Sequence, residues 1–192
     1  QEGPLDMRMD ARNTLTAADL VNTASAEELA KIFWEYGDER DSRRFAKAIV
    51  HDRELRRFTT TKQLAELIER ISPRHGRKAH PATKVFQSLR IAVNDEIGSL
   101  RRGLDAAMKI LKPGGRLAVI TFHSLEDRVV KDFGRAGARD YTIPGGTDVP
   151  ELRKPRKPEL NLVTRKAIKP SEAELEENPR SRSAQLRVFE KI

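Results

Sequence analysis

Hydrophobic residues recur every three or four positions through the first part of the chain, which is the spacing of one face of an α-helix. Leu29, Ile32 and Phe33 form one such run, and Ser25 before it is suited to cap a helix. Runs of this kind fill residues 16–78. The pattern therefore predicts a series of short helices in this part of the chain.

The longest helical pattern follows Pro81, a residue that is favourable at a first helical position. A single apolar stripe runs from Phe86 to Leu111 at steps of three and four. Gly98 and Gly103 weaken it slightly and are the points at which a break is expected. The stripe predicts one long helix.

The pattern changes at residues 112–115, whose Lys-Pro-Gly-Gly sequence ends the helix. Residues 116–121 form a continuous apolar run rich in β-formers, which predicts a central strand covered on both faces. We interpret residues 134–159 as a loop, and we expect strands over residues 160–168 and 184–192. The second part of the chain therefore predicts an α/β arrangement.

Polar side chains follow the predicted strand at its carboxyl end, where ligands bind in open α/β sheets. They are His123, Ser124, Glu126, Asp127 and Arg128. A second interpretation is structural: the ring of His123 starts the next helix, and the carboxylates suit its first turn. A Ser-His nucleophile is disfavoured because no G-x-S-x-G sequence surrounds Ser124. We expect no metal site, since the spacing matches no helical zinc signature.

The composition narrows the function classes. The 192 residues contain 37 Lys and Arg against 29 Asp and Glu, a net charge of +8, and no Cys. A disulfide scaffold, a Cys-ligated zinc site and a thiol nucleophile are therefore excluded. No apolar run approaches the ~20 residues of a membrane span, and no signal peptide opens the chain. We expect a cytoplasmic protein that makes no membrane contact and binds a polyanion such as nucleic acid.

The positive charge gathers on one predicted helix, where Arg40, Arg43, Arg44 and Lys47 share a face. Such a face is usually a solvated surface, and the alternative is phosphate binding. Further cations lie nearby in the sequence: Arg53, Arg56, Arg57, Arg74, Arg77 and Lys78. Their number favours phosphate contacts.

A cofactor of the nucleotide type normally needs a strand, a Gly-rich loop and a helix in succession, so that backbone N–H groups approach its phosphates or ribose. This arrangement does not occur in the sequence. The chain also begins at Gln1 and enters directly into a motif. We interpret the chain as part of a longer protein whose cofactor loop lies elsewhere.

Five sequence blocks together resemble a known family, the bacterial small-subunit ribosomal RNA (cytosine-N4)-methyltransferases of the RsmH or MraW type. They are Gly-Pro-Leu-Asp-Met-Arg-Met-Asp at 3–10, His-Pro-Ala-Thr with its continuation at 80–91, Lys-Pro-Gly-Gly-Arg-Leu at 112–117, Phe-His-Ser-Leu-Glu-Asp-Arg at 122–128, and Asn-Pro-Arg-Ser-Arg-Ser-Ala at 178–184. The match covers about the last two thirds of a typical member. It departs at residues 10–12, where Asp-Ala-Arg replaces the usual Asp-Pro-Thr, and in the missing upstream Gly-rich loop.

The resemblance implies an α/β fold, namely the C-terminal part of a class I (Rossmann-like) S-adenosylmethionine-dependent methyltransferase with an inserted all-helical domain. Residues 1–10 would be the active-site loop, and residues 11–79 the inserted substrate-recognition domain. Residues 80–192 would form the C-terminal half, with the long helix, strand five and closing antiparallel strands. An unpaired edge of strand five would favour a homodimer.

The implied activity is methyl transfer from S-adenosylmethionine to the exocyclic N4 of a cytidine in the decoding region of small-subunit ribosomal RNA. The partner would be that RNA or the assembling small subunit. The alternative is a non-catalytic RNA-binding or ribosome-assembly protein derived from such an enzyme. This chain alone is expected to be inactive if a longer protein carries the cofactor loop.

The chemistry assigns candidate roles, because the amine lone pair of cytosine is delocalised and the nitrogen must be oriented and deprotonated. Asp6, His123 and Asp127 are the predicted catalytic residues: a carboxylate accepts from N4–H, and the imidazole orients the base or relays the proton. The predicted substrate-binding residues are Met7, Arg8, Ser124, Glu126, Arg128, Asn178, Arg180, Arg182 and Ser183. The predicted RNA phosphate contacts are Arg40, Arg43, Arg44 and Lys47.

Overall fold

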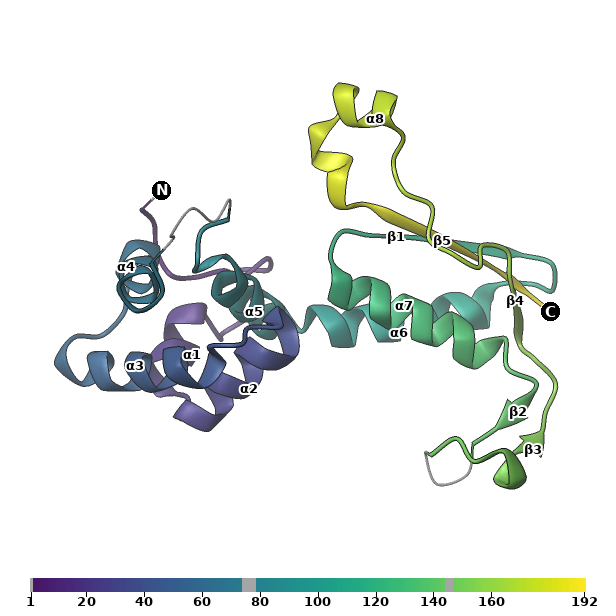
Figure 1. Ribbon diagram of the computed structural model, residues 1–192, viewed down its shortest axis with the longest axis horizontal. Helices are drawn as coiled ribbons and strands as arrows, with labels where there is room; N and C mark the ends of the chain where they lie inside the picture. The colour runs from purple at the N-terminus through teal and green to yellow at the C-terminus, as the bar shows by residue number, and fades with distance from the viewer. Residues whose placement is uncertain (1, 74–78, 144–146) are drawn as a thin grey trace. The chain divides into compact units, whose positions relative to one another are not determined.

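A computed structural model of the chain describes residues 2–73, 79–143 and 147–192 (Figure 1). The chain divides into two units, residues 1–96 and 97–192, each with its own hydrophobic core. The predicted basic linker at residues 74–78 lies outside the described residues. Within the described ranges, no helix combines the length and the apolar character that crossing a membrane requires.

The first unit is a set of helices, as the apolar pattern predicts. They are α1 (Ala17–Thr23), α2 (Ala26–Gly37), α3 (Ser42–Leu55), α4 (Thr61–Ile71) and α5 (Thr83–Asn94). Thr16, Ser25 and Thr60 each start a helix with a capping box, in which the hydroxyl accepts a backbone N–H three residues ahead. Local sequence therefore sets where these helices begin.

The core of this unit is formed by the apolar faces of all five helices. Its largest fully buried side chains include Leu5, Leu29, Phe33, Phe45, Ile49, Leu64, Ile68 and Leu89. The N-terminal segment belongs to it as well: the amide of Leu5 donates to Thr59 O at 2.9 Å, and Ala18 N donates to Leu5 O at 2.7 Å. The motif at residues 3–10 is thereby anchored on the helices.

The prediction of one long helix after Pro81 is wrong. α5 ends at Asn94, and α6 (Glu96–Ile110) begins two residues later. Asp95 separates them with a left-handed backbone (φ 46°), and its N–H donates to Ala92 O and Ile91 O. Asp tolerates this conformation better than most residues, so the break falls there and not at the glycines.

The second unit contains a three-stranded antiparallel sheet in the order β1-β5-β4, with α6 and α7 on one face (Figure 1). Its remaining elements are β1 (Arg116–Thr121), α7 (Ser124–Gly137), β2 (Tyr141–Thr142), η1 (Pro150–Leu152), β3 (Lys154–Pro155), β4 (Leu160–Leu162), α8 (Glu172–Glu177), η2 (Pro179–Ser183) and β5 (Gln185–Lys191). β2 and β3 form a separate two-stranded hairpin. The chain as a whole is an α/β protein.

Phe189 lies at the centre of the second core. Its ring meets Phe133 of α7 edge to face, with centroids 6.0 Å apart. Leu104 of α6, Val130 of α7 and Leu160 of β4 complete the buried cluster. Sheet and helices are therefore joined around one aromatic side chain on the middle strand.

Strand β1 falls where the sequence predicts it, but it is not covered on both faces. Leu117 and Val119 pack against the helices, whereas Ile120 on the opposite face is 59% exposed. Successive side chains alternate between faces, and the described residues cover only one of them. Among those residues β1 pairs with β5 alone, and the homodimer stays a prediction.

Two other boundaries differ from the prediction. The strand expected over residues 160–168 pairs regularly only at its start, because the amides of Val163 and Thr164 both donate to Val188 O, as in a bulge. The loop expected from residue 134 begins later, since α7 continues through Gly137. Gly134 faces the ring of Phe189, and Gly137 faces Leu160, so these glycines serve close packing rather than a turn.

Replacing Gly134 by Ala should destabilise the protein, because the new Cβ would lie against the Phe189 ring, 2.8 Å from Cζ. We expect a loss of about 1–3 kcal/mol, the usual cost of overpacking, measured by urea unfolding. Gly103→Ala in α6 is the matched control, since nothing lies within 4 Å of its Cβ position. It should stabilise by up to about 1 kcal/mol through helix propensity. Equal effects of the two substitutions would contradict the packing described.

Candidate active site

The turn from β1 into α7 is built by His123 and Glu126. The imidazole Nδ1 of His123 accepts the backbone N–H of Glu126 at 3.3 Å. In return, the carboxylate of Glu126 accepts from the backbone amides of Phe122 at 2.8 Å and His123 at 3.3 Å. The structure thus gives His123 and Glu126 the capping role that was the alternative interpretation. Glu126 Oε2, the oxygen that makes both contacts, is therefore not free to bind substrate.

The hydrogen bond to Nδ1 determines the tautomer of the neutral His123 ring. A nitrogen that accepts from a backbone N–H carries no proton, so the proton lies on Nε2. Nε2 is buried, has no hydrogen-bond partner among the described residues, and lies 3.4 Å from Glu126 Oε1. His123 therefore offers one unused donor and no unused acceptor.

Asp127, one residue further along α7, is held by Arg187 of β5. The guanidinium donates from Nε to Oδ1 at 2.7 Å and from Nη2 to Oδ2 at 2.9 Å. Both side chains are largely buried, with 14% and 10% exposed. The hydrogen bonds that the guanidinium donates to the Asp127 carboxylate raise the pKa of Arg187. Asp127 thus joins the first turn of α7 to the middle strand, and Ser124 and Arg128 beside it are exposed.

The predicted residues at 178–183 lie at the same end of the sheet. Thr121, the last residue of β1, pairs with Gln185, the first residue of β5, and η2 directly precedes it. Asn178 caps η2 by accepting from the backbone N–H of Arg180 at 3.2 Å. The side chains of Asn178, Arg180, Arg182 and Ser183 are exposed, whereas Ser181 is buried. The chain order and the register therefore bring two predicted segments to one end of β1 and β5.

Asp6, Met7 and Arg8 lie in the first unit. Arg8 donates from Nε to Asp6 Oδ1 at 2.7 Å and from Nη2 to Oδ2 at 2.9 Å. This hydrogen bond lowers the pKa of Asp6 to about 2, so the carboxylate is ionised at neutral pH. Arg8 Nη1 also donates to Asn13 O at 2.7 Å, which ties the loop back to itself.

A strained backbone accompanies this ion pair. Met7 has φ 64°, a left-handed conformation that a non-glycine residue adopts at a cost. The side-chain amide of Asn94 holds it in place by donating to Met7 O at 2.8 Å and accepting from Met9 N at 2.7 Å. The segment that carries Asp6 and Arg8 is therefore pre-shaped.

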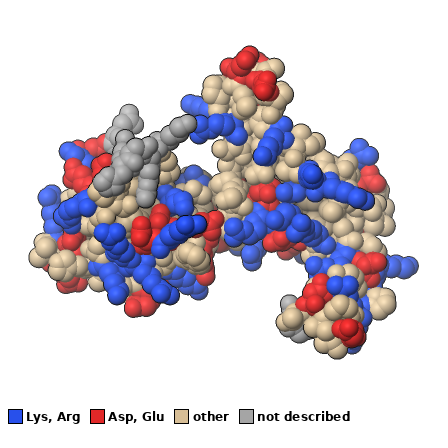
Figure 2. Space-filling view, viewed as in Figure 1, with Lys and Arg blue, Asp and Glu red and all other residues tan. Residues whose placement is uncertain are grey.

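The four predicted phosphate contacts, Arg40, Arg43, Arg44 and Lys47, are all exposed, on α3 and the turn before it. On the face shown in Figure 2, Lys and Arg side chains cover more of the surface than acidic ones. Arg53 is not available for phosphate contacts in the same way, because its Nη1 donates to Val21 O at 3.1 Å and to Ala24 O at 2.6 Å. Arg74, Arg77 and Lys78 lie outside the described residues.

Sequence reasoning missed two residues that hold predicted site segments, Arg187 in the second unit and Asn94 in the first. Arg187 occupies a position on β5 that shares its face with Phe189, and an arginine on a buried face normally has a carboxylate partner. That signal indicates a partner without identifying it. Asn94 falls outside the apolar stripe of the expected long helix and carries no sequence signal of its role.

The helices and the small sheet define an α/β protein whose polar side chains gather where a strand ends and a helix begins. The sequence model of the MraW methylase family matches residues 1–192. The chain belongs to this family, and the resemblance of the five sequence blocks is thereby confirmed.

The relatives of this chain include proteins named ribosomal RNA small subunit methyltransferase H. The protein of Carboxydothermus hydrogenoformans is 52% identical over 192 residues, which cover 100% of this chain and 61% of the relative. That of Caulobacter vibrioides is 56% identical over 98% of this chain and 60% of the relative. That of Methylobacterium nodulans is 52% identical over 100% of this chain and 56% of the relative. The chain thus spans about three fifths of the length of the curated relatives it matches.

The stabilising effect of Asp6 should depend on pH in a defined window. Because folding lowers its pKa from 3.8 to about 2, the ion pair stabilises the protein above pH 3.8, and this contribution is lost as the pH falls through about 2. Asp6→Asn should therefore lower the urea midpoint at pH 7 and converge with the wild type in acid. Arg8→Gln should behave in the same way, since it removes the other partner. A difference that stays constant down to pH 2 would contradict the ion pair.

Proposed function

We propose that the protein containing this chain is an S-adenosylmethionine-dependent methyltransferase that modifies the N4 amine of a cytidine in the decoding region of small-subunit ribosomal RNA. Membership of the MraW methylase family over residues 1–192, with relatives named ribosomal RNA small subunit methyltransferase H, is the observation that carries this proposal. The substrate is the RNA itself or the assembling small subunit, and the site of action is the cytoplasm. Membership of the family favours an enzyme over a purely RNA-binding protein.

In this proposal residues 80–192 are the C-terminal half of a class I (Rossmann-like) methyltransferase domain, with β1 as strand five, and residues 11–79 are an all-helical insertion. Among the described residues one edge of β1 is unpaired and one face is exposed, which supports this, because an apolar strand of this kind normally has further neighbours. Polar groups at the carboxyl end of β1 match the place where such sheets bind ligands.

S-adenosylmethionine, when bound, supplies an electrophilic methyl group. The described residues contain no strand followed by a Gly-rich loop and a helix, so they do not fit as its main cradle, and no cofactor contact is assigned to them. In this proposal these residues bind and orient the target base. The attacking nitrogen must point along the line of transfer, and one flipped or single-stranded cytidine is the expected ligand.

Asp6 suits the role of hydrogen-bond acceptor for the cytosine amine. Its carboxylate is charged at neutral pH and partly exposed, and its lone pairs exceed the two contacts with the Arg8 guanidinium. A pKa of about 2 makes it a weak base. Asp6 therefore orients N4–H, and the proton leaves to water after the methyl group has been transferred and the nitrogen has become acidic.

His123 suits the role of donor, and not that of proton relay. Its Nδ1 is used by the cap of α7, whereas Nε2–H is unused among the described residues. Such a donor matches the O2 or N3 acceptor of cytosine, and because Nε2 is buried, the neighbouring side chains must move aside when the base binds. Asp127, paired with Arg187, acts by positioning the start of α7, and Arg8, Arg180 and Arg182 supply positive charge for phosphates.

The product of the reaction tests the proposed function. The gene product containing this chain is incubated with methyl-labelled S-adenosylmethionine and small-subunit RNA or subunits, and the RNA is digested to nucleosides. We expect the label in N4-methylcytidine alone. Label in another nucleoside, or none with either substrate form, would overturn the proposal.

His123→Asn separates the two roles of the imidazole. Asn is among the preferred N-cap residues, so this variant should keep the thermal stability that His123→Ala loses. If Nε2–H holds the base, turnover of the Asn variant should still fall about 100-fold, as for loss of one pre-positioned donor, with RNA affinity little changed. Wild-type turnover in the Asn variant would show that His123 serves only as a cap.

A further inference from the structure

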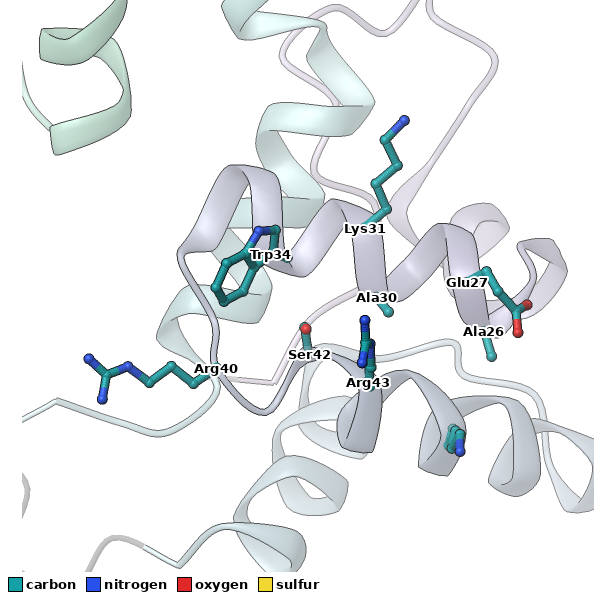
Figure 3. A pocket seen from close by; sticks show the side chains of 9 residues that line it. Ala26, Glu27, Ala30, Lys31, Trp34, Arg40, Ser42 and Arg43 are labelled. Atoms are coloured by element: carbon teal, nitrogen blue, oxygen red, sulfur yellow. The ribbon is translucent and has the colours of Figure 1, made fainter.

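A groove with a volume of about 660 Å³ lies between α2 and the start of α3 in the first unit (Figure 3). The small side chains of Ala26 and Ala30 line it from α2, one turn apart, and Trp34 follows at the next turn. Arg43 and Lys47 line it from α3. The small alanine side chains beside the Trp34 indole leave room for a planar ligand to lie against the ring.

Trp34 takes no part in the core and is 58% exposed. The buried side of α2 is formed by Leu29 and Phe33 instead. Trp34 is also the only tryptophan in the chain. An indole face that is open to solvent is a surface on which a nucleobase can stack, because every base has a flat π-face.

Cations line the same groove as this ring. Arg40, Arg43 and Lys47 form no ion pair or hydrogen bond with their side chains within the described ranges of the chain. Lys31 Nζ lies 4.0 Å from Glu35 Oε1, a long ion pair. Among the described residues that line the groove, Glu27 is the single carboxylate. Cations without a carboxylate partner along one groove favour a bound polyanion.

We propose that this groove binds an unpaired nucleotide of the RNA substrate, with its base stacked on Trp34 and its flanking phosphates held by Arg40, Arg43 and Lys47. The inference rests on the proposed function in that the polyanion is RNA. A duplex keeps its base faces stacked inside and would use only the cations. An acidic protein segment would likewise gain nothing from the indole.

Fluorescence of Trp34 reports on this groove alone, because the chain has no other tryptophan. The 192-residue chain is titrated with a single-stranded oligoribonucleotide, with anisotropy of a label on the RNA as a second signal. We expect the indole emission to be quenched with the same midpoint as the anisotropy change. A duplex of the same length should quench much less.

Substitutions separate stacking from charge. Trp34→Ala should weaken binding about tenfold, which is within the usual range for losing one stacked base, while Trp34→Phe should keep most of the affinity. Leu55→Ala is the matched control, because Leu55 is 81% exposed on the same unit and lines no part of the groove. It should leave RNA binding unchanged. Circular dichroism checks that each variant keeps its helices.

An oligonucleotide with abasic residues keeps the phosphates and lacks the bases. It should give no quenching and should bind wild type and Trp34→Ala equally. If intact RNA binds without quenching and Trp34→Ala matches the wild type, the stacking site is wrong, while methylation of cytidine by the gene product still tests the proposed function separately. Equal quenching by an acidic peptide would also overturn the inference.

Discussion

The buried ion pair between Asp127 and Arg187 is the contact on which the geometry of the second unit depends. It joins the first turn of α7 to the middle strand β5, directly beside the end of β1. Two charges removed from water stabilise a protein little by themselves, but removal of one partner usually costs about 3–5 kcal/mol, because the other charge stays buried alone. The pair therefore specifies one position for α7, and with it the position of His123.

The first unit uses a different device for the same purpose. Its N-terminal segment holds a left-handed Met7, a conformation that costs energy unless the surroundings impose it. Asn94 bonds both sides of that residue, and Arg8 bonds Asp6 and the backbone of Asn13. A loop held in this way keeps the Asp6 carboxylate charged and fixed in orientation before substrate binds. Little further ordering is then needed when a base binds.

Two kinds of contact recognise the substrate in the function proposed here. Exposed cations on α3 act on any phosphate backbone and weaken with salt. Groups at the end of β1 act on one base. The combination suits an enzyme that must hold a long structured RNA while one cytidine is extruded.

Much of the local structure was predictable from the sequence. The helix starts at Thr16, Ser25 and Thr60 and the strand at residues 116–121 depend on contacts within a few residues, which the sequence states directly. The break at Asp95 was not predictable from the apolar stripe, because the stripe continues across it. Its cause is one backbone conformation, which spacing does not record.

The sequence by itself determined which residues are chemically able to act: the carboxylates, the imidazole, the arginines and the lone indole, and the family to which they belong. Only the tertiary structure decided which hydrogen bonds and ion pairs these side chains make and which of them reach the surface. It assigned Nδ1 of His123 to a helix cap, Asp127 to Arg187 sixty residues away, and Trp34 to the surface instead of the core. The reason is that hydrogen bonds and ion pairs between distant segments depend on where the backbone brings them, whereas composition and spacing report only what each segment can offer.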